Sequence, residues 1–198
     1  MMKALLMKDL YVLWRQMKIF FLLIVVFAAV PSVFQNTFAI LYAAMVPYTA
    51  FAQDESSKWN TLAVMMPYST KEIVVSKYLL GGIAIAAATG ITMVFQNVMK
   101  LLGGPAVGNM TLTMAMLIAV IMVDITLPLV FRFGVEKGRM IVVFTLAMIG
   151  GSAGALSSLV EDGVRVPFNG GHFTLVIAAA ATAVSVPLSM KMWERRKR

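Results

Sequence analysis

Residues 110–131 read MTLTMAMLIAVIMVDITLPLVF, and Asp124 is the only charged residue among them. A helix needs about 20 predominantly apolar residues to cross a bilayer core of about 30 Å, so this stretch is long enough to span a membrane. Barrel strands are about ten residues long and alternate polar with apolar side chains, whereas this run is continuous. The stretch therefore predicts a transmembrane helix and a helical membrane protein.

Further apolar runs lie on both sides of this stretch, at residues 19–34, 37–52, 78–98, 140–159 and 173–190. The first two are short, so flanking residues would have to extend them or the bilayer would have to thin locally. The composition agrees, because 60% of the residues are hydrophobic and 13% are charged, against about 45–50% and about 25% in a soluble domain. We expect an all-α integral membrane protein whose six transmembrane helices occupy residues 19–198.

The formal net charge of +8 would suit a nucleic-acid-binding protein, but the positions of the basic residues indicate another partner. Of the 17 lysines and arginines, all except Lys100 and Arg165 lie in residues 1–18, 53–77, 132–139 or 191–198. These segments fall on one side of the membrane if six spans alternate, and basic residues near spans are retained in the cytoplasm. We therefore expect cytoplasmic termini, contact with the lipid bilayer and no nucleic acid.

Residues 1–18 combine charge with hydrophobicity in a helical pattern. One stripe is apolar and has Trp14 at its margin: Met2, Leu6, Leu10, Leu13 and Met17. The other side is polar: Lys8, Asp9, Arg15 and Gln16. This pattern predicts an amphipathic interfacial helix whose apolar face enters the acyl boundary. The alternative is a basic leader that only anchors the first span.

The loop at residues 53–77 is the longest polar segment, and it reads QDESSKWNTLAVMMPYSTKEIVVSK. Its first part has helical character from Asp54 to Met66, and Pro67 would end that helix. Ser69 or Thr70 would then begin a new helix with Glu72 in its first turn. The second cytoplasmic loop, at residues 132–139, contains two glycines that let a short chain reverse direction.

At these two loops the sequence resembles the small six-span permease subunits of ABC-2 type transporters, including exporters of peptide toxins and bacteriocin-like peptides. The resemblance covers the whole chain in span order. Its first pieces are Asp54-Glu55 with Lys58-Trp59-Asn60, followed by Met66-Pro67, Lys71-Glu72-Ile73-Val74 and Ser76-Lys77-Tyr78. Its second piece runs from Pro128 through Phe131-Arg132-Phe133-Gly134 to Glu136-Lys137-Gly138-Arg139. Lys8-Asp9-Leu10 resembles part of the family's elbow helix.

The resemblance implies a permease subunit of an ATP-driven exporter in the bacterial plasma membrane. The first loop would be a coupling helix that docks on a separate ABC ATPase, although a headgroup-bound helix is the alternative. The expected docking residues are Asp54, Glu55, Lys58, Trp59 and Asn60, and those of the second loop are Arg132, Glu136, Lys137 and Arg139. A second permease subunit, identical or different, would complete the path, and amphipathic peptides would be the cargo.

The residues of an ATPase or of an intramembrane protease are absent from the sequence. No Gly-x-x-x-x-Gly-Lys-Ser/Thr stretch occurs, so ATP and Mg²⁺ would be bound by the partner. His172 is the only histidine, at the outer edge of the last span, and catalysis needs oriented partners. We expect no enzyme activity, cofactor or metal site in this chain. A non-transporting membrane anchor, immunity or sensor protein is the alternative function.

Asp124 is the one acidic residue inside a predicted span. It lies about 12 Å of helical rise from Arg132 at the inner surface. Carboxylates at such depth are costly and usually face the interior of a bundle. Asp124 is therefore either a polar residue of the translocation path, such as a partner for a cationic substrate, or a structural contact with a hydroxyl or the backbone.

Overall fold

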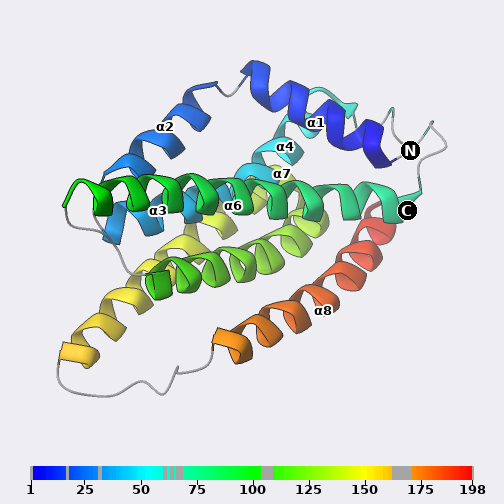
Figure 1. Cartoon of the computed structure of the whole chain (residues 1–198). Helices are drawn as coiled ribbons and strands as arrows, with labels where there is room; N and C mark the ends of the chain where they lie inside the picture. The colour runs from blue at the N-terminus through cyan, green and yellow to red at the C-terminus, as the bar shows by residue number, and fades with distance from the viewer. Residues whose placement is uncertain are drawn as a thin grey trace.

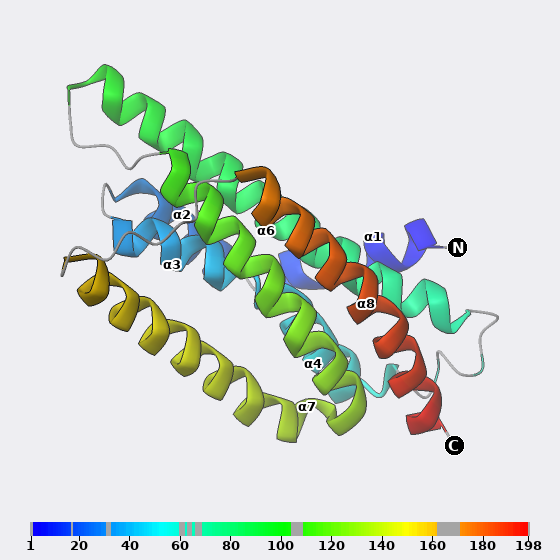
Figure 2. The same ribbon diagram turned by 90° about the horizontal axis from the view of Figure 1, so that it is seen from below.

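The computed structural model describes residues 2–16, 18–30, 33–59, 62, 65, 69–103, 109–161 and 171–197, and this part of the chain is helical without strands (Figure 1). Its helices are α1 Met2–Gln16, α2 Lys18–Ala29, α3 Val33–Ala43, α4 Val46–Ser56, α6 Thr70–Leu101, α7 Asn109–Glu161 and α8 Gly171–Lys197. The all-α class is confirmed for these residues. The two termini lie at the same end of the bundle in Figures 1 and 2.

Two helical stretches are long and apolar enough to cross a membrane, judged by length and composition within the described residues. They are α6, Thr70–Leu101, and the part of α7 from Leu112–Gly138. They include or largely coincide with the spans predicted at residues 78–98 and 110–131. The number of membrane crossings and the orientation of the termini stay predictions.

The first predicted span is shorter in the structure than its apolar run. Helix α2 has 12 residues and ends at Ala29, and the chain bends at Val30 just before Pro31. Residues that precede proline are biased away from helical backbone angles, so the helix stops here. Because α3 begins at Val33, the apolar run at residues 19–34 is divided between two helices, and its role as a membrane span stays a prediction.

The second predicted span, residues 37–52, is divided between α3 and α4. Pro47 lies in the first turn of α4 and has no N–H to donate to the carbonyl oxygen of Ala43. The chain instead tightens between the two helices, where the Met45 N–H donates to the carbonyl oxygen of Tyr42 at 3.0 Å. The break therefore has an identifiable cause, since sharp helix kinks occur mostly at proline.

Helix α7 consists of two limbs that meet at Gly134 and run back past one another (Figure 2). Gly134 has φ 80° and ψ −179°, a combination that is essentially restricted to glycine. Gly138 permits close approach after the turn, because a Cβ atom there would lie 3.0 Å from Val130 Cγ2. The predicted reversal at residues 132–139 is confirmed, but a single residue makes it and helix continues on both sides.

Helix α6 begins with a capping box. Ser69 Oγ accepts a hydrogen bond from the Glu72 N–H at 3.2 Å, and Glu72 Oε2 accepts one from the Ser69 N–H at 3.3 Å. These two bonds satisfy donors that a helix start leaves without partners. The predicted cap with Glu72 in the first turn is confirmed, with Ser69 as the capping residue.

The loop before α6 differs from the prediction. Helix α4 continues through Asp54 to Ser56, and Lys58 then has φ 54°, which breaks the helix. Asp54 therefore lies in the last turn of α4 and does not begin a separate helix. Most of the following segment up to Met66 lies outside the described residues.

Three aromatic rings hold α4, α7 and α8 together at one end of the core. Phe51, Phe131 and Trp193 meet edge to face with ring centroids 5.1–5.9 Å apart, and all three are buried. Such contacts add to the free energy gained from burying the rings. Outward-facing apolar residues such as Val94 and Val184 are 63% and 69% exposed, which is expected where lipid and not water surrounds the helices.

Helix α1 packs against the bundle through a face that includes part of the predicted apolar stripe. Leu5, Asp9 and Leu13 are its buried described residues; of the predicted stripe, Leu13 is buried, Leu6 is half-buried and Leu10 is exposed. Asp9 lies on the buried face because it meets a lysine of α6 there. The exposed face is itself apolar in part, since Met7, Leu10, Tyr11 and Trp14 lie on it.

Candidate functional site

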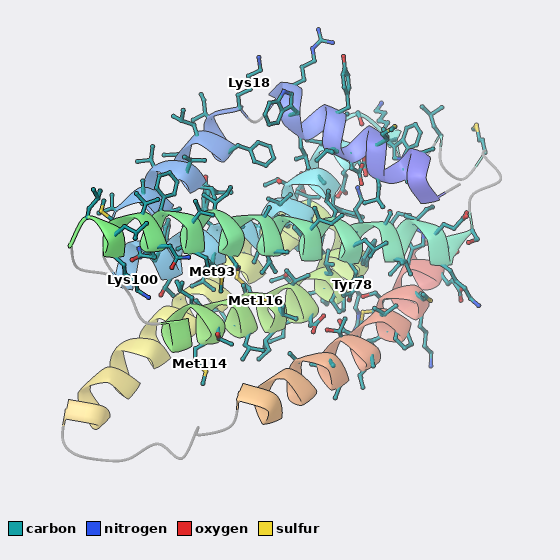
Figure 3. The ribbon with its side chains drawn as sticks, in the orientation of Figure 1. Lys18, Tyr78, Met93, Lys100, Met114 and Met116 are labelled. Carbon is teal, nitrogen blue, oxygen red and sulfur yellow. The ribbon has the colours of Figure 1, made fainter. Side chains whose placement is uncertain are left out.

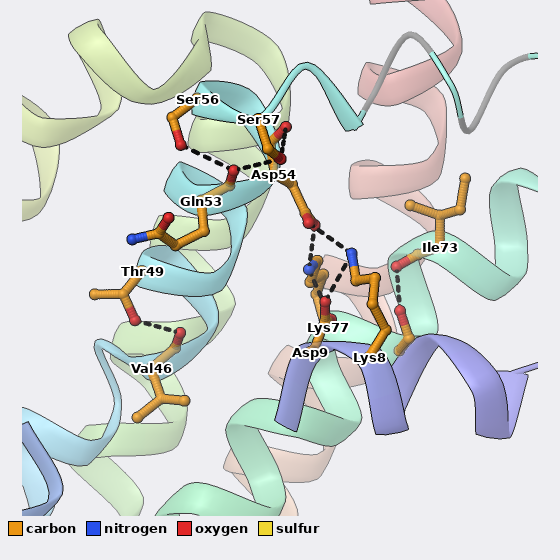
Figure 4. A network of polar contacts seen from close by, with 11 residues as sticks. Lys8, Asp9, Val46, Thr49, Gln53, Asp54, Ser56, Ser57, Ile73 and Lys77 are labelled. Carbon is orange, nitrogen blue, oxygen red and sulfur yellow. Dashed lines mark hydrogen bonds and ion pairs between the residues drawn. The ribbon is translucent and has the colours of Figure 1, made fainter. Parts of the chain in front are cut away.

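Two lysines and two aspartates from three helices form a compact ion cluster (Figure 4). Lys77 Nζ of α6 lies 2.7 Å from Asp9 Oδ2 of α1 and 2.6 Å from Asp54 Oδ2 of α4. Lys8 Nζ of α1 lies 2.6 Å from Asp54 Oδ1 and 3.0 Å from Asp9 Oδ1. Each lysine therefore contacts both aspartates, and the cluster joins α1 to the last turn of α4 and to the N-terminal part of α6.

The cluster is balanced in charge and mostly buried. The side chains of Asp9 and Lys77 are 3% and 4% exposed, that of Asp54 is 11% exposed, and that of Lys8 is 25% exposed. Removing charges from water is costly, and each charge here is offset by two opposite partners. Loss of one member would leave an uncompensated charge in a buried place.

Trp59 lies beside this ion cluster, in contact with Lys8. Lys8 Nζ lies 4.3 Å from the centroid of the Trp59 ring, which is a cation–π contact. The ring is half-buried and packs against the hydrophobic core. The structure thus places the aromatic residue that was predicted as a docking anchor partly against its own chain.

The turn of α7 is fastened to the same end of the bundle. Glu55 Oε2 accepts a hydrogen bond from the Val135 N–H at 2.9 Å, and Tyr48 Oη donates one to the Val135 carbonyl oxygen at 3.3 Å. Val135 directly follows the glycine that reverses α7. Helix α4 therefore contributes residues to the ion cluster and also contacts the turn of α7. The described parts of the two predicted loops are joined by these direct contacts.

The predicted docking residues separate into two groups by exposure. Asp54 and Glu55 are engaged in contacts within the chain, as described above. The exposed group is Lys58, Arg132, Glu136 and Lys137. Arg132 lies over the ring of Phe133, with its guanidinium carbon 5.1 Å from the centroid. Asn60 and the side chain of Arg139 lie outside the described residues.

The sequence interpretation missed the pairing between Lys8, Asp9 and Lys77. Asp9 and Lys77 are separated by 68 positions along the chain, and Lys8 and Asp54 by 46. The residue types alone gave a weak indication that these charges are buried and paired. Lys8 and Asp9 lie near an apolar stripe, and Asp54 follows an apolar run. No local pattern indicates which lysine meets which aspartate.

A second polar cluster lies inside the bundle, where α6, α7 and α8 meet. Thr182 Oγ1 of α8 donates a hydrogen bond to Asp124 Oδ2 at 2.8 Å, and Ser185 Oγ donates to the Asp124 carbonyl oxygen. Tyr78 Oη of α6 shares hydrogen bonds with Ser185 Oγ and Ser189 Oγ at 2.6 and 2.8 Å. The buried Asp124 thus has the hydroxyl contact that one of the two predicted roles required.

A cavity of about 400 Å³ adjoins this polar cluster between α6 and α8. Tyr78 and Thr182 line it together with apolar residues such as Leu79 and Ile83. Among the described side chains, the carboxylate of Asp124 has Thr182 as its hydrogen-bond donor and has no basic partner. Its place in a translocation path stays a prediction.

The two long apolar helices and the exposed apolar side chains favour a helical membrane protein. A comparison with known families is more specific. The family model described as ABC-2 family transporter protein matches residues 4–194. The chain therefore belongs to this family of membrane transporter components. Its members generally work with ABC ATPase partners, and the predicted ABC-2 permease identity is confirmed.

The finer part of the resemblance, to permeases of peptide toxin and bacteriocin exporters, stays a prediction. No curated protein and no solved structure matches the chain.

Proposed function

We propose that this chain is the transmembrane permease subunit of an ATP-binding cassette exporter, driven by a separate ATPase subunit. Family membership supports a permease-type component. The coupling proposal is supported by the contacts at one end of the bundle, where residues of α4 contact α1, α6 and the turn of α7. A chain without a nucleotide site needs such a structure to receive motion from its motor.

The contacts at this end supply a path for that motion. An ATPase that displaced the end of α4 would also displace α6 through Lys77 and the two limbs of α7 through Val135. Both α6 and the first limb of α7 are long enough to cross the membrane. Coupling of this kind needs a contiguous set of packed and hydrogen-bonded elements, and the described contacts form one.

The exposed charges are the better candidates for contact with the ATPase. In the proposal, Lys58 and the exposed residues of the second loop touch the partner, whereas Asp54 and Glu55 position the segment that carries Lys58. Trp59 adds a half-buried aromatic surface beside them. Asn60 and Arg139 keep their predicted docking role.

The proposed export path includes Asp124 and the cavity between α6 and α8. Its apolar lining with a few hydroxyl groups suits an amphipathic cargo, and peptides are the proposed class. A second permease subunit, identical or different, would close the path. The protein would lie in the bacterial plasma membrane as a multi-pass subunit, and ATP with Mg²⁺ would be bound by the ATPase.

The experiment is co-purification of the chain with the P-loop ATPase encoded beside it, followed by an ATPase assay in lipid nanodiscs. The variant Lys58→Glu with Lys137→Glu reverses two exposed charges and should lower the bound ATPase at least tenfold. Lys100→Glu, at the opposite end of α6, is the matched control and should bind normally.

Equal binding by both variants would refute the docking surface. If the unchanged chain binds no ATPase, the alternative of a non-transporting anchor, immunity or sensor protein takes its place.

A further inference from the structure

A groove lies between the corner formed by α1 and α2 and the middle of α6. Its volume is about 460 Å³, and its lining is apolar apart from Lys18 and the indole of Trp14. The groove is on the side of α6 away from the α6–α8 cavity, because the two sites share no residue of that helix. It is also separate from the residues proposed to meet the ATPase.

Short side chains on α6 make one wall of this groove. Ala84, Ala87, Ala88 and Ile91 follow the helical spacing of three and four, so they lie on one face. This face extends for about 10 Å along the helix axis. The small side chains of Ala84, Ala87 and Ala88 leave an elongated space along this face, which larger side chains would have filled.

Aromatic and branched residues make the other wall. The rings of Trp14 and Phe21 lie on either side of the corner with their centroids 5.9 Å apart, and Val25 continues the wall along α2. Trp14 is 64% exposed. Indole rings favour the level of the lipid headgroups, where one end is apolar and the other is polar.

Positive charge lies at the corner. Lys18 lines the groove and is exposed, and its side chain extends away from α6 in Figure 3. Arg15, in the last turn of α1, is exposed as well. Within the described residues no acidic side chain lines this groove. A molecule with an anionic head and an apolar tail is complementary to this arrangement.

We propose that this groove binds one anionic phospholipid from the leaflet in which α1 lies. An acyl chain occupies the space against the alanine face of α6, and the phosphate lies beside Lys18 and Arg15. The lipid then fills the groove between α1, α2 and α6. The proposal does not depend on the cargo or on the ATPase.

The test is native mass spectrometry of the full chain, with dioleoyl phosphatidylglycerol and dioleoyl phosphatidylcholine as probes. These lipids have the same acyl chains, but only the first has a net negative charge. We expect the unchanged protein to retain one phosphatidylglycerol in preference to phosphatidylcholine. Lys18→Gln should weaken phosphatidylglycerol binding about fivefold, the effect of one lysine near an anionic surface. Lys100→Gln removes another exposed lysine and should have no effect.

A pair of neighbouring alanines tests the acyl-chain site. Ala87 is exposed and lines the groove, whereas Ala86 is exposed and lines the α6–α8 cavity. Ala87→Phe should remove the retained lipid, and Ala86→Phe should leave it in place.

Equal loss in both alanine variants, or no preference for the anionic lipid, would overturn the proposal. So would lipid retention that is indifferent to Lys18, which would indicate an apolar amphipath without a headgroup contact. If Ala87→Phe instead converts a dimer into a monomer, the groove is the contact site for a second copy of the chain.

Discussion

Replacement of Lys77 by methionine tests whether the ion cluster holds the elbow helix in place. Lys77 Nζ contacts Asp9 and Asp54 at 2.7 and 2.6 Å, and its side chain is 4% exposed. Lys77→Met leaves two aspartates against Lys8 alone, a buried cluster with one uncompensated negative charge. Breaking a buried ion pair by removing one partner destabilises proteins by about 3–5 kcal/mol. We expect a loss of that size in the free energy of unfolding.

Lys8→Met provides an internal comparison of burial. Lys8 contacts the same two aspartates, but its side chain is 25% exposed, so water can reach the site it leaves. The remaining charges keep Lys77 as a buried partner. We expect a smaller loss, about 1–3 kcal/mol, in the range of hydrogen bonds to charged groups.

A double variant separates charge balance from packing. Asp9→Asn combined with Lys77→Met leaves one lysine and one aspartate, Lys8 and Asp54, at 2.6 Å. We expect this double variant to be more stable than Lys77→Met alone, although it lacks one more charged group. The measurement is reversible unfolding in mixed micelles, followed by the intrinsic fluorescence of tryptophan. The reasoning is refuted if Lys8→Met costs as much as Lys77→Met, or if the double variant is less stable than the single one.

Two further variants test the turn of α7 and the buried acid. Gly134→Ala should destabilise the protein by about 1–3 kcal/mol because alanine does not tolerate φ 80° with ψ −179°. In the same unfolding assay in mixed micelles Gly90→Ala, a helical position with open space, should stabilise by up to about 1 kcal/mol. Asp124→Asn should keep the fold, since the amide oxygen can still accept from Thr182, but lower export roughly tenfold. Unchanged export in proteoliposomes would leave Asp124 with a structural role alone.

The features that depend on neighbouring residues were predictable from the sequence. The capping box of Ser69 and Glu72 joins residues three apart, and the reversal at Gly134 needs a backbone conformation that one residue type supplies. The spans at residues 78–98 and 110–131 follow from continuous hydrophobicity, which does not depend on tertiary contacts. The break at Pro47 was also visible in principle, because proline lacks the donor that a continuous helix requires.

The features that depend on distant residues were not predictable. A helical projection of residues 1–18 puts Leu6, Leu10 and Leu13 on an apolar stripe expected to enter the lipid, and it puts Asp9 on the polar side. In the structure Asp9 is buried with a lysine from α6, and that pairing decides which face turns inward. Similarly, the family resemblance implied a docking role for Asp54 and Glu55 but did not indicate which residues of the chain they contact. Their partners, Lys77 and Val135, come from other parts of the chain.

The ion cluster also has a consequence for biosynthesis. Lys77 is the 68th residue added after Asp9, so α1 is synthesised well before its buried partner exists. Until then Asp9 and Asp54 share Lys8 alone, and α1 and α4 lack the second lysine that joins them to α6. A nascent chain interrupted between Asp54 and Lys77 therefore has two aspartates and one lysine at this place, with one negative charge that is not balanced until Lys77 is added.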